Sequence, residues 1–165
     1  MTQQVTGADP DLPPNARRVQ EALDGHQVSG RVVRLADSAR TAAEAAAALG
    51  CEQGAIVKSL VFLADGDPVL ILASGAHQVD TIKVAALLGV ATVARADADT
   101  VRSVTGFPIG GVAPVGHPDP LGTLVDIALQ RYDVVWAAAG TPHTVFQTNY
   151  AELLRITAGE PAEIN

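Results

Sequence analysis

The sequence is poor in cysteine and in aromatic residues, and each shortage narrows what the protein can be. Cys51 is the only cysteine, which excludes an internal disulfide and leaves no second thiolate for a zinc site. Aromatic residues make up 4% of the chain, so its core must be built from Ala, Val, Leu and Ile. No stretch approaches the roughly 20 apolar residues of a membrane span, and the N-terminus lacks the basic and apolar regions of a signal peptide. We therefore expect a cytoplasmic protein with no membrane partner.

Positive charge is also scarce. Eleven Lys and Arg stand against 18 Asp and Glu, which gives a formal net charge of −7. A protein that holds nucleic acid over a long tract needs dense Lys and Arg to neutralise phosphates. The composition therefore argues against DNA as a partner and allows RNA only through a few local contacts.

Length and hydrophobicity predict one domain. A chain of 165 residues, 48% of them hydrophobic, can fill one core and is short for two. Residues 1–14 have no periodicity and are expected to form a disordered leader, residues 15–158 the domain, and residues 159–165 a tail. Hairpins alternate with helical crossovers, so the predicted fold class is α/β, with a mixed, barrel-like β-sheet and surrounding helices.

Cap residues and apolar patterns mark the elements. Thr41 and Glu44 have capping-box spacing, and Asp65 and Gly66 suit a hairpin turn. Each of the other four helices is expected to begin at a capping residue, namely Asn15, Asp80, Asp97 and Asn149. The predicted helices are 16–23, 41–50, 80–88, 97–106 and 149–156, and the predicted strands are 30–35, 56–63, 69–73, 90–94, 124–127, 134–138 and 145–148.

The stretch AIVKSLVFL, residues 55–63, reads as a buried strand with Lys58 at its centre. An ammonium group there is costly to desolvate unless it is paired or opens onto a pocket. A strand lysine seen alone is more often an edge residue with its head in water. The chain has only two lysines, Lys58 and Lys83, and arginine fills most of its cationic positions. This favours the interpretation that the charge of Lys58 serves a pocket.

A second stretch, GFPIGGVAPVG at residues 106–116, has too many Gly and Pro residues for a regular element. Glycines let backbone N–H groups approach a ligand, and prolines stiffen the turns between them. Together with Lys58, this glycine-proline loop suits a site for a small anionic or carbonyl group.

Other chemistries find less support. His26, His77, His117 and His143 show no metal-ligand spacing, and we expect His26 and His77 to be exposed while His117 and His143 could border a pocket. Asp126 lies in an apolar strand, where it can pair with a buried cation or end the strand, and a structural acid is at least as good an interpretation as a catalytic one. No metal is expected without metal-ligand spacing, and no nucleotide cofactor is expected because the GxGxxG and Walker patterns are absent. The absence of GxSxG, and of a Ser with a nearby His and acid, argues against a serine-hydrolase triad.

The order and spacing of these segments resemble the YbaK/EbsC family. The segments are the Ala-rich helix ending at Gly50, AIVKSLVF, VDTIKVAALLG, TGFPIGGVAPVG, VVWAAAG and TNYAELLRIT, and they span about residues 15–158. The family includes the editing domain of bacterial prolyl-tRNA synthetases and its free-standing relatives. The resemblance implies a trans-editing hydrolase that deacylates mischarged tRNA at its 3′ acceptor end, working beside prolyl-tRNA synthetase or another synthetase.

The resemblance also implies a site. Lys58 would position the substrate, and backbone N–H groups of Gly110 and Gly111 would form an oxyanion hole. Ser59 is expected on the face of the strand opposite Lys58, which argues against a Ser-Lys dyad. The further substrate-binding residues are Thr41, Ser59, Gly106, Pro108, Pro114, Gly116, Ala138, Gly140 and His143.

Two departures bear on specificity. Thr41 stands where deacylases of cysteinyl-tRNA carry an aromatic residue, and Val145 stands where they carry an acid. A small aminoacyl group such as alanyl, on tRNA for proline or another amino acid, is therefore the predicted substrate. The alternatives are a non-catalytic module that binds a tRNA acceptor end or a synthetase, and a Schiff-base enzyme that uses Lys58 on a carbonyl substrate.

Overall fold

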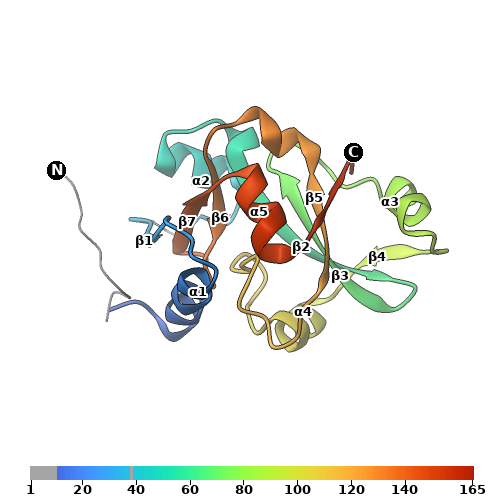
Figure 1. Cartoon of the computed structure of the whole chain (residues 1–165), viewed down its shortest axis with the longest axis horizontal. Coiled ribbons are helices and arrows are strands. Elements are labelled where there is room, and N and C mark those ends of the chain that lie inside the picture. Colours follow the sequence, from blue (N-terminus) through green and yellow to red (C-terminus); the bar gives the residue numbers. More distant parts are fainter. Residues whose placement is uncertain (1–10, 38) are drawn as a thin grey trace.

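A mixed eight-stranded sheet with five α-helices around it forms the whole described structure (Figure 1). This computed structural model describes residues 11–37 and 39–165. The helices are α1 (Pro14–Gly25), α2 (Ala42–Leu49), α3 (Thr81–Leu88), α4 (Ala98–Thr105) and α5 (Tyr150–Thr157). The strands are β1 (Val32–Arg34), β2 (Ile56–Ala64), β3 (Asp67–Ser74), β4 (Val93–Arg95), β5 (Gly122–Asp126), β6 (Val135–Ala138), β7 (Thr144–Thr148) and β8 (Glu160–Ala162), and two 3₁₀ turns span Gln53–Ala55 and Ile127–Arg131.

The strand order is β1-β7-β6-β2-β3-β5-β8, and β4 pairs with β2 beside β6. The β2–β3, β2–β4, β6–β7 and β1–β7 pairs are antiparallel, whereas β2–β6, β3–β5 and β5–β8 are parallel. The single α/β domain and the mixed sheet predicted from the sequence are confirmed. β2 is the centre of this arrangement because it contacts three other strands.

Helices cover both faces of the sheet. Buried side chains of α1, α4 and α5 pack with one face, as Val19, Val101 and Leu153 show. On the other face, α3 packs through Val84 against the β2–β3 hairpin, and α2 packs through its alanines. The Ala-rich sequence of α2 therefore allows a close approach to β2.

Most local predictions hold. The capping box of Thr41 and Glu44 is present, Asp80, Asp97 and Asn149 cap their helices, and the hairpin turns at Asp65 and Gly66, both with positive φ. The predicted cap of Asn15 is wrong, because its side chain instead donates to the carbonyl of Gly140 at 3.3 Å. The strand predicted at 90–94 is displaced to β4.

The two ends of the domain differ from expectation. The predicted tail, 159–165, contributes β8 to the sheet and buries Ile164 completely. Of the predicted leader, residues 1–10 lie outside the described part of the chain, but Leu12 is buried against α1. The hydrophobic pattern of the sequence did not reveal these two segments, because each is short and adds only a few residues to the core.

Candidate functional site

The sheet has a gap beside the middle of β2. On one side, β2 pairs with β3 along its whole length. On the other side, β6 pairs only with Ile56 and Val57, and β4 pairs only from Phe62 to Ala64. The edge between these two neighbours is therefore open at the centre of the sheet.

Strand alternation identifies the residue at this gap. The N–H of Gly75 donates to the carbonyl of Ile56 at 2.7 Å, so in β2 the even-numbered residues bond to β3 and the odd-numbered ones face the other edge. Val57 faces β6, and the carbonyl of Val61 accepts from Ala96 at 3.1 Å. Ser59 lies between them, and its N–H and C=O have no partner in residues 11–37 and 39–165.

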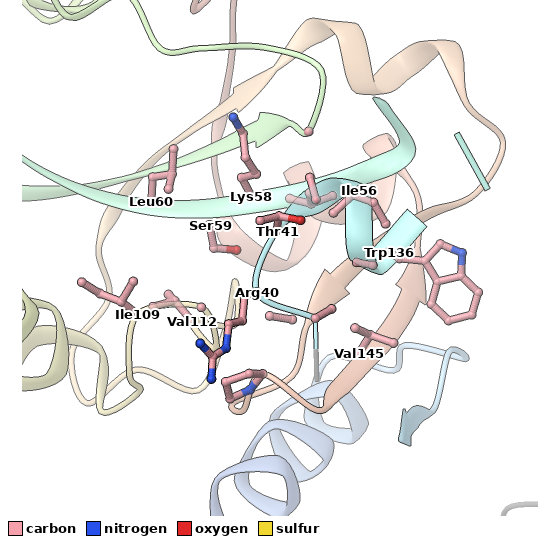
Figure 2. Close-up of a pocket in the computed structure, with 18 of the residues that line it drawn as sticks. Arg40, Thr41, Ile56, Lys58, Ser59, Leu60, Ile109, Val112, Trp136 and Val145 are labelled. Atoms are coloured by element: carbon pink, nitrogen blue, oxygen red, sulfur yellow. The ribbon is translucent and has the colours of Figure 1, made fainter. Parts of the chain in front are cut away.

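A cavity of about 560 Å³ opens at this gap (Figure 2). Its walls come from β2, the segment before α2, the end of β4, the glycine-proline loop and the β6–β7 connection. The charged side chains along its described walls are Lys58, Arg40 and Arg95, and neither Asp nor Glu is among them. In a chain of net charge −7, this local excess of cations favours an anionic ligand.

Lys58 and Ser59 lie on opposite sides of β2, as predicted (Figure 2). The ammonium of Lys58 donates to the backbone carbonyl of His77, and its side chain is half-buried. Burial lowers the pKa of Lys58, the positive charge of Arg95 lowers it further, and the carboxylate of Asp126 acts in the opposite direction. The lysine is thus held by one neutral acceptor rather than by an ion pair.

Asp126 anchors the loop that carries this acceptor. Its carboxylate is 1% exposed and accepts from the N–H of Ser74 at 3.0 Å and of Ala128 at 2.9 Å. It also contacts Nδ1 of His77 at 2.9 Å. The expectation that His77 is an exposed histidine is therefore wrong, and the hydrogen bonds of Asp126 are those of an acid that holds the fold together.

The glycine-proline loop supplies part of the opposite wall. Ile109, Gly110 and Val112 line the cavity, and Gly110 has a φ of 89° with open space around it. The N–H of Gly111 donates to the carbonyl of Pro108 at 2.9 Å. The prediction that Gly111 offers a free N–H to a ligand is therefore wrong, because a tight turn already uses that donor.

Gly111 has a packing role instead. A Cβ on Gly111 would lie 2.8 Å from Cα and 2.9 Å from N of Thr141, so the loop rests directly on the β6–β7 connection. We expect Gly111→Ala to lower the free energy of unfolding by about 2 kcal/mol, because backbone atoms must move apart. Urea unfolding measures the change, and Gly122→Ala, whose Cβ meets nothing within 4 Å, serves as the control. Equal stability of the two variants would contradict the close contact.

The remaining predicted residues divide between the cavity and its supports. Thr41 and Ala138 line the cavity. His143 is exposed to solvent and does not line it. His117 is turned toward the carbonyl of Ala113 at 2.7 Å, and burial lowers its pKa. The predicted residues that do not line the cavity are Gly106, Pro108, Gly111, Pro114, Gly116, Gly140 and His143.

Sequence reasoning missed two cations of the site. Arg40 directly precedes the helix cap Thr41, and Arg95 is the last residue of β4. A basic residue just before a helix cap was a visible pattern, because a helix N-terminus also attracts anions. Arg95 had no such local pattern, since only the pairing of β4 with β2 brings it to the cavity.

These features define a small α/β domain with one cationic, partly apolar cavity built around an open strand edge. The chain matches the family described as "Aminoacyl-tRNA editing domain" over residues 36–156. The protein belongs to this family, which confirms the resemblance seen in the sequence. The description of the family connects the domain with the editing of aminoacyl-tRNA.

Known relatives agree with this assignment. The chain is 36% identical over 132 residues to a proline–tRNA ligase of Geobacter sulfurreducens, covering 74% of this chain and 23% of the ligase. It is 32% identical over 137 residues to the corresponding ligase of Bacillus licheniformis, covering 76% of this chain and 24% of that protein. The chain thus spans about a quarter of the length of these curated relatives.

Solved structures show the same fold. A crystal structure of a candidate trans-editing enzyme for prolyl tRNA synthetase is 45% identical, has a TM-score of 0.89, and is matched over 94% of this chain and 99% of that one. A scaffold protein used for epitope grafting is 43% identical with a TM-score of 0.87, over 93% of this chain and 98% of that one. Among the described residues, no helix is both long enough and apolar enough to cross a membrane.

Proposed function

We propose that the protein is a trans-editing hydrolase that removes a small, wrongly attached aminoacyl group, such as alanyl, from tRNA. The observation that carries this proposal is the cavity, which joins three cations with an apolar wall in an acidic chain. Its size suits the terminal nucleotide and a small acyl group better than a length of RNA helix. The similarity to proline–tRNA ligases and to a candidate trans-editing enzyme supports tRNA for proline as the carrier.

The chemistry requires little of the protein. An aminoacyl ester is already activated, so water attacks the carbonyl carbon and the bond from that carbon to the ribose oxygen breaks. The leaving ribose oxygen takes up one proton of that water and becomes a hydroxyl, while the amino acid leaves as a carboxylate and the second proton passes to solvent. Backbone N–H donors that face the cavity can stabilise the oxyanion of the intermediate, each worth roughly 3 to 4 kcal/mol in acyl-transfer sites. Gly110 stays a proposed donor, and Lys58 and Arg40 supply positive charge for the terminal phosphate.

The acidic surface fits this role. With a net charge of −7 the protein has little capacity for long-range binding of RNA, so contacts near the acceptor end must carry recognition. A synthetase that already holds the tRNA would raise the local concentration of the substrate. We therefore propose prolyl-tRNA synthetase, or another synthetase, as the partner.

A deacylation panel tests the proposal. Purified protein is added to tRNA for proline that carries labelled alanyl, cysteinyl, seryl or prolyl groups, with and without EDTA, and the loss of label is followed. We expect the alanyl ester to be hydrolysed fastest, the prolyl ester to be spared, and EDTA to have no effect.

Each other outcome has a distinct meaning. Binding of the charged tRNA with no turnover above spontaneous hydrolysis would identify a non-catalytic acceptor-end module. Activity that disappears in EDTA and returns with zinc would show a metal-dependent mechanism. No group of three or more His, Cys, Asp or Glu residues suited to a metal is found in the described part of the chain.

A further inference from the structure

Ser59, at the open edge of β2, lines the cavity and has three polar groups without a hydrogen-bond partner in the described part of the chain. The N–H and C=O of Ser59 face the gap between β6 and β4 without partners in the described structure. Its hydroxyl oxygen is buried and is the one buried side-chain polar atom found without a hydrogen bond in residues 11–37 and 39–165. Unpaired backbone groups are costly to bury, so the free N–H and C=O of Ser59 point to a ligand that pairs with both.

An aminoacyl group has the matching pattern. In a hydrogen-bonded antiparallel pair, two opposed residues exchange both of their N–H···O=C bonds. The α-amino group and the ester carbonyl of an aminoacyl ester flank one Cα, as the N–H and C=O of a strand residue do. The amino group can therefore donate to the carbonyl of Ser59 while the ester carbonyl accepts from its N–H.

We propose that the aminoacyl group docks on Ser59 as a one-residue β-bridge, so that the side chain of Ser59 limits the size of the acyl side chain. This inference rests on the proposed editing function and names the residue that selects the substrate. The ester carbonyl oxygen then receives the N–H of Ser59 in place of the N–H of Gly111, which a turn has already used.

The direction of the bridge places the rest of the substrate. An antiparallel partner runs opposite to β2, so the ester oxygen and the ribose lie on the side of Val57. The N-terminus of α2, with Arg40 and Thr41, lines that part of the cavity. A phosphate attached to the ribose thus approaches a cation and a helix N-terminus.

The same geometry places the acyl side chain. Directly opposed residues of an antiparallel pair have their side chains on one face, with Cβ atoms about 5 Å apart. The acyl side chain therefore lies beside Ser59, on the side of β2 where Ile109 and Val112 lie, and away from Lys58 (Figure 2). A larger group at position 59 must shorten the side chain that can be accepted.

The test compares matched esters that differ by single carbon groups. tRNA for proline is charged with glycyl, alanyl or 2-aminobutyryl groups, and kcat/KM is measured for the parent, Ser59→Ala and Ser59→Val. We expect Ser59→Val to lower the alanyl-to-glycyl ratio about tenfold, because one methylene changes discrimination by tenfold or more. We expect Ser59→Ala to raise the 2-aminobutyryl-to-alanyl ratio by a similar factor.

Thermal unfolding separates this role from a structural one. Ser59→Ala removes a buried hydroxyl that has no partner, so its Tm should equal or exceed that of the parent. Ser103→Val, an exposed serine of α4, is the matched control and should leave both ratios unchanged.

The outcomes distinguish the two proposals. Unchanged ester ratios in both Ser59 variants, with an active parent, would overturn the docking on Ser59 and leave the editing function standing. A marked fall in Tm for Ser59→Ala would also overturn it, because the hydroxyl would then be structural. A parent protein with no deacylase activity on any ester would overturn both.

Discussion

Lys58→Ala is expected to lower kcat/KM for deacylation about 100-fold while the protein stays folded. Hydrogen bonds to charged groups contribute about 1.5 to 3 kcal/mol, and the upper end of this range corresponds to that factor. The fold should tolerate the change because the ammonium has one backbone acceptor and burial already disfavours its charge. Circular dichroism and Tm check the fold, and single-turnover hydrolysis checks the rate.

Two further variants define the role of this lysine. Lys83→Ala is the matched control, because Lys83 lies at the surface with Glu163 and the carbonyl of Asn165 as its partners. Lys58→Arg keeps the positive charge and should recover part of the rate, whereas a Schiff-base mechanism would lose all activity in this variant. An early-melting Lys58→Ala protein would instead show that the lysine is structural.

Asp126→Ala is expected to lower the free energy of unfolding by about 3 kcal/mol. The substitution leaves two buried backbone N–H groups without an acceptor and removes the partner of His77. An unsatisfied buried donor costs about 1 to 3 kcal/mol, so the losses at Ser74 and Ala128 together reach this size. Urea denaturation at neutral pH measures the change.

The same variant should also impair the site. Asp126 holds the loop whose carbonyl accepts from Lys58, so a released loop frees the lysine from its observed position. Asp126→Asn keeps one acceptor oxygen and should fall between the parent and Asp126→Ala in stability. Asp119→Ala, an exposed acid in a loop, is the control. A fully stable Asp126→Ala protein would contradict the anchoring role.

Local chemistry explains which predictions succeeded. Thr41, Asp80, Asp97 and Asn149 cap helices because a short polar side chain accepts from the N–H groups of the residues that follow it. Glu44 completes the capping box by accepting in return from the N–H of Thr41. The alternating faces of β2 also followed from the sequence, which placed Lys58 and Ser59 on opposite sides. Both kinds of prediction depend only on neighbours in the chain.

The unsuccessful predictions depended on contacts between distant residues. The N–H of Gly111 looked available in the sequence, and only the folded loop shows that Pro108 uses it. His77 looked exposed because its partner, Asp126, lies 49 residues further along the chain. Arg95 reaches the cavity through strand pairing that no local pattern reveals.

The unpaired edge of β2 at the gap between β6 and β4 is too short to promote aggregation. An unpaired strand edge is a template on which other chains can add a strand and begin to aggregate. Here β6 and β4 stop the edge on either side of Ser59, so a continuous peptide has no room to extend the sheet. Single amino-acid esters and amides should therefore compete for the site, whereas unfolded proteins and long peptides should not.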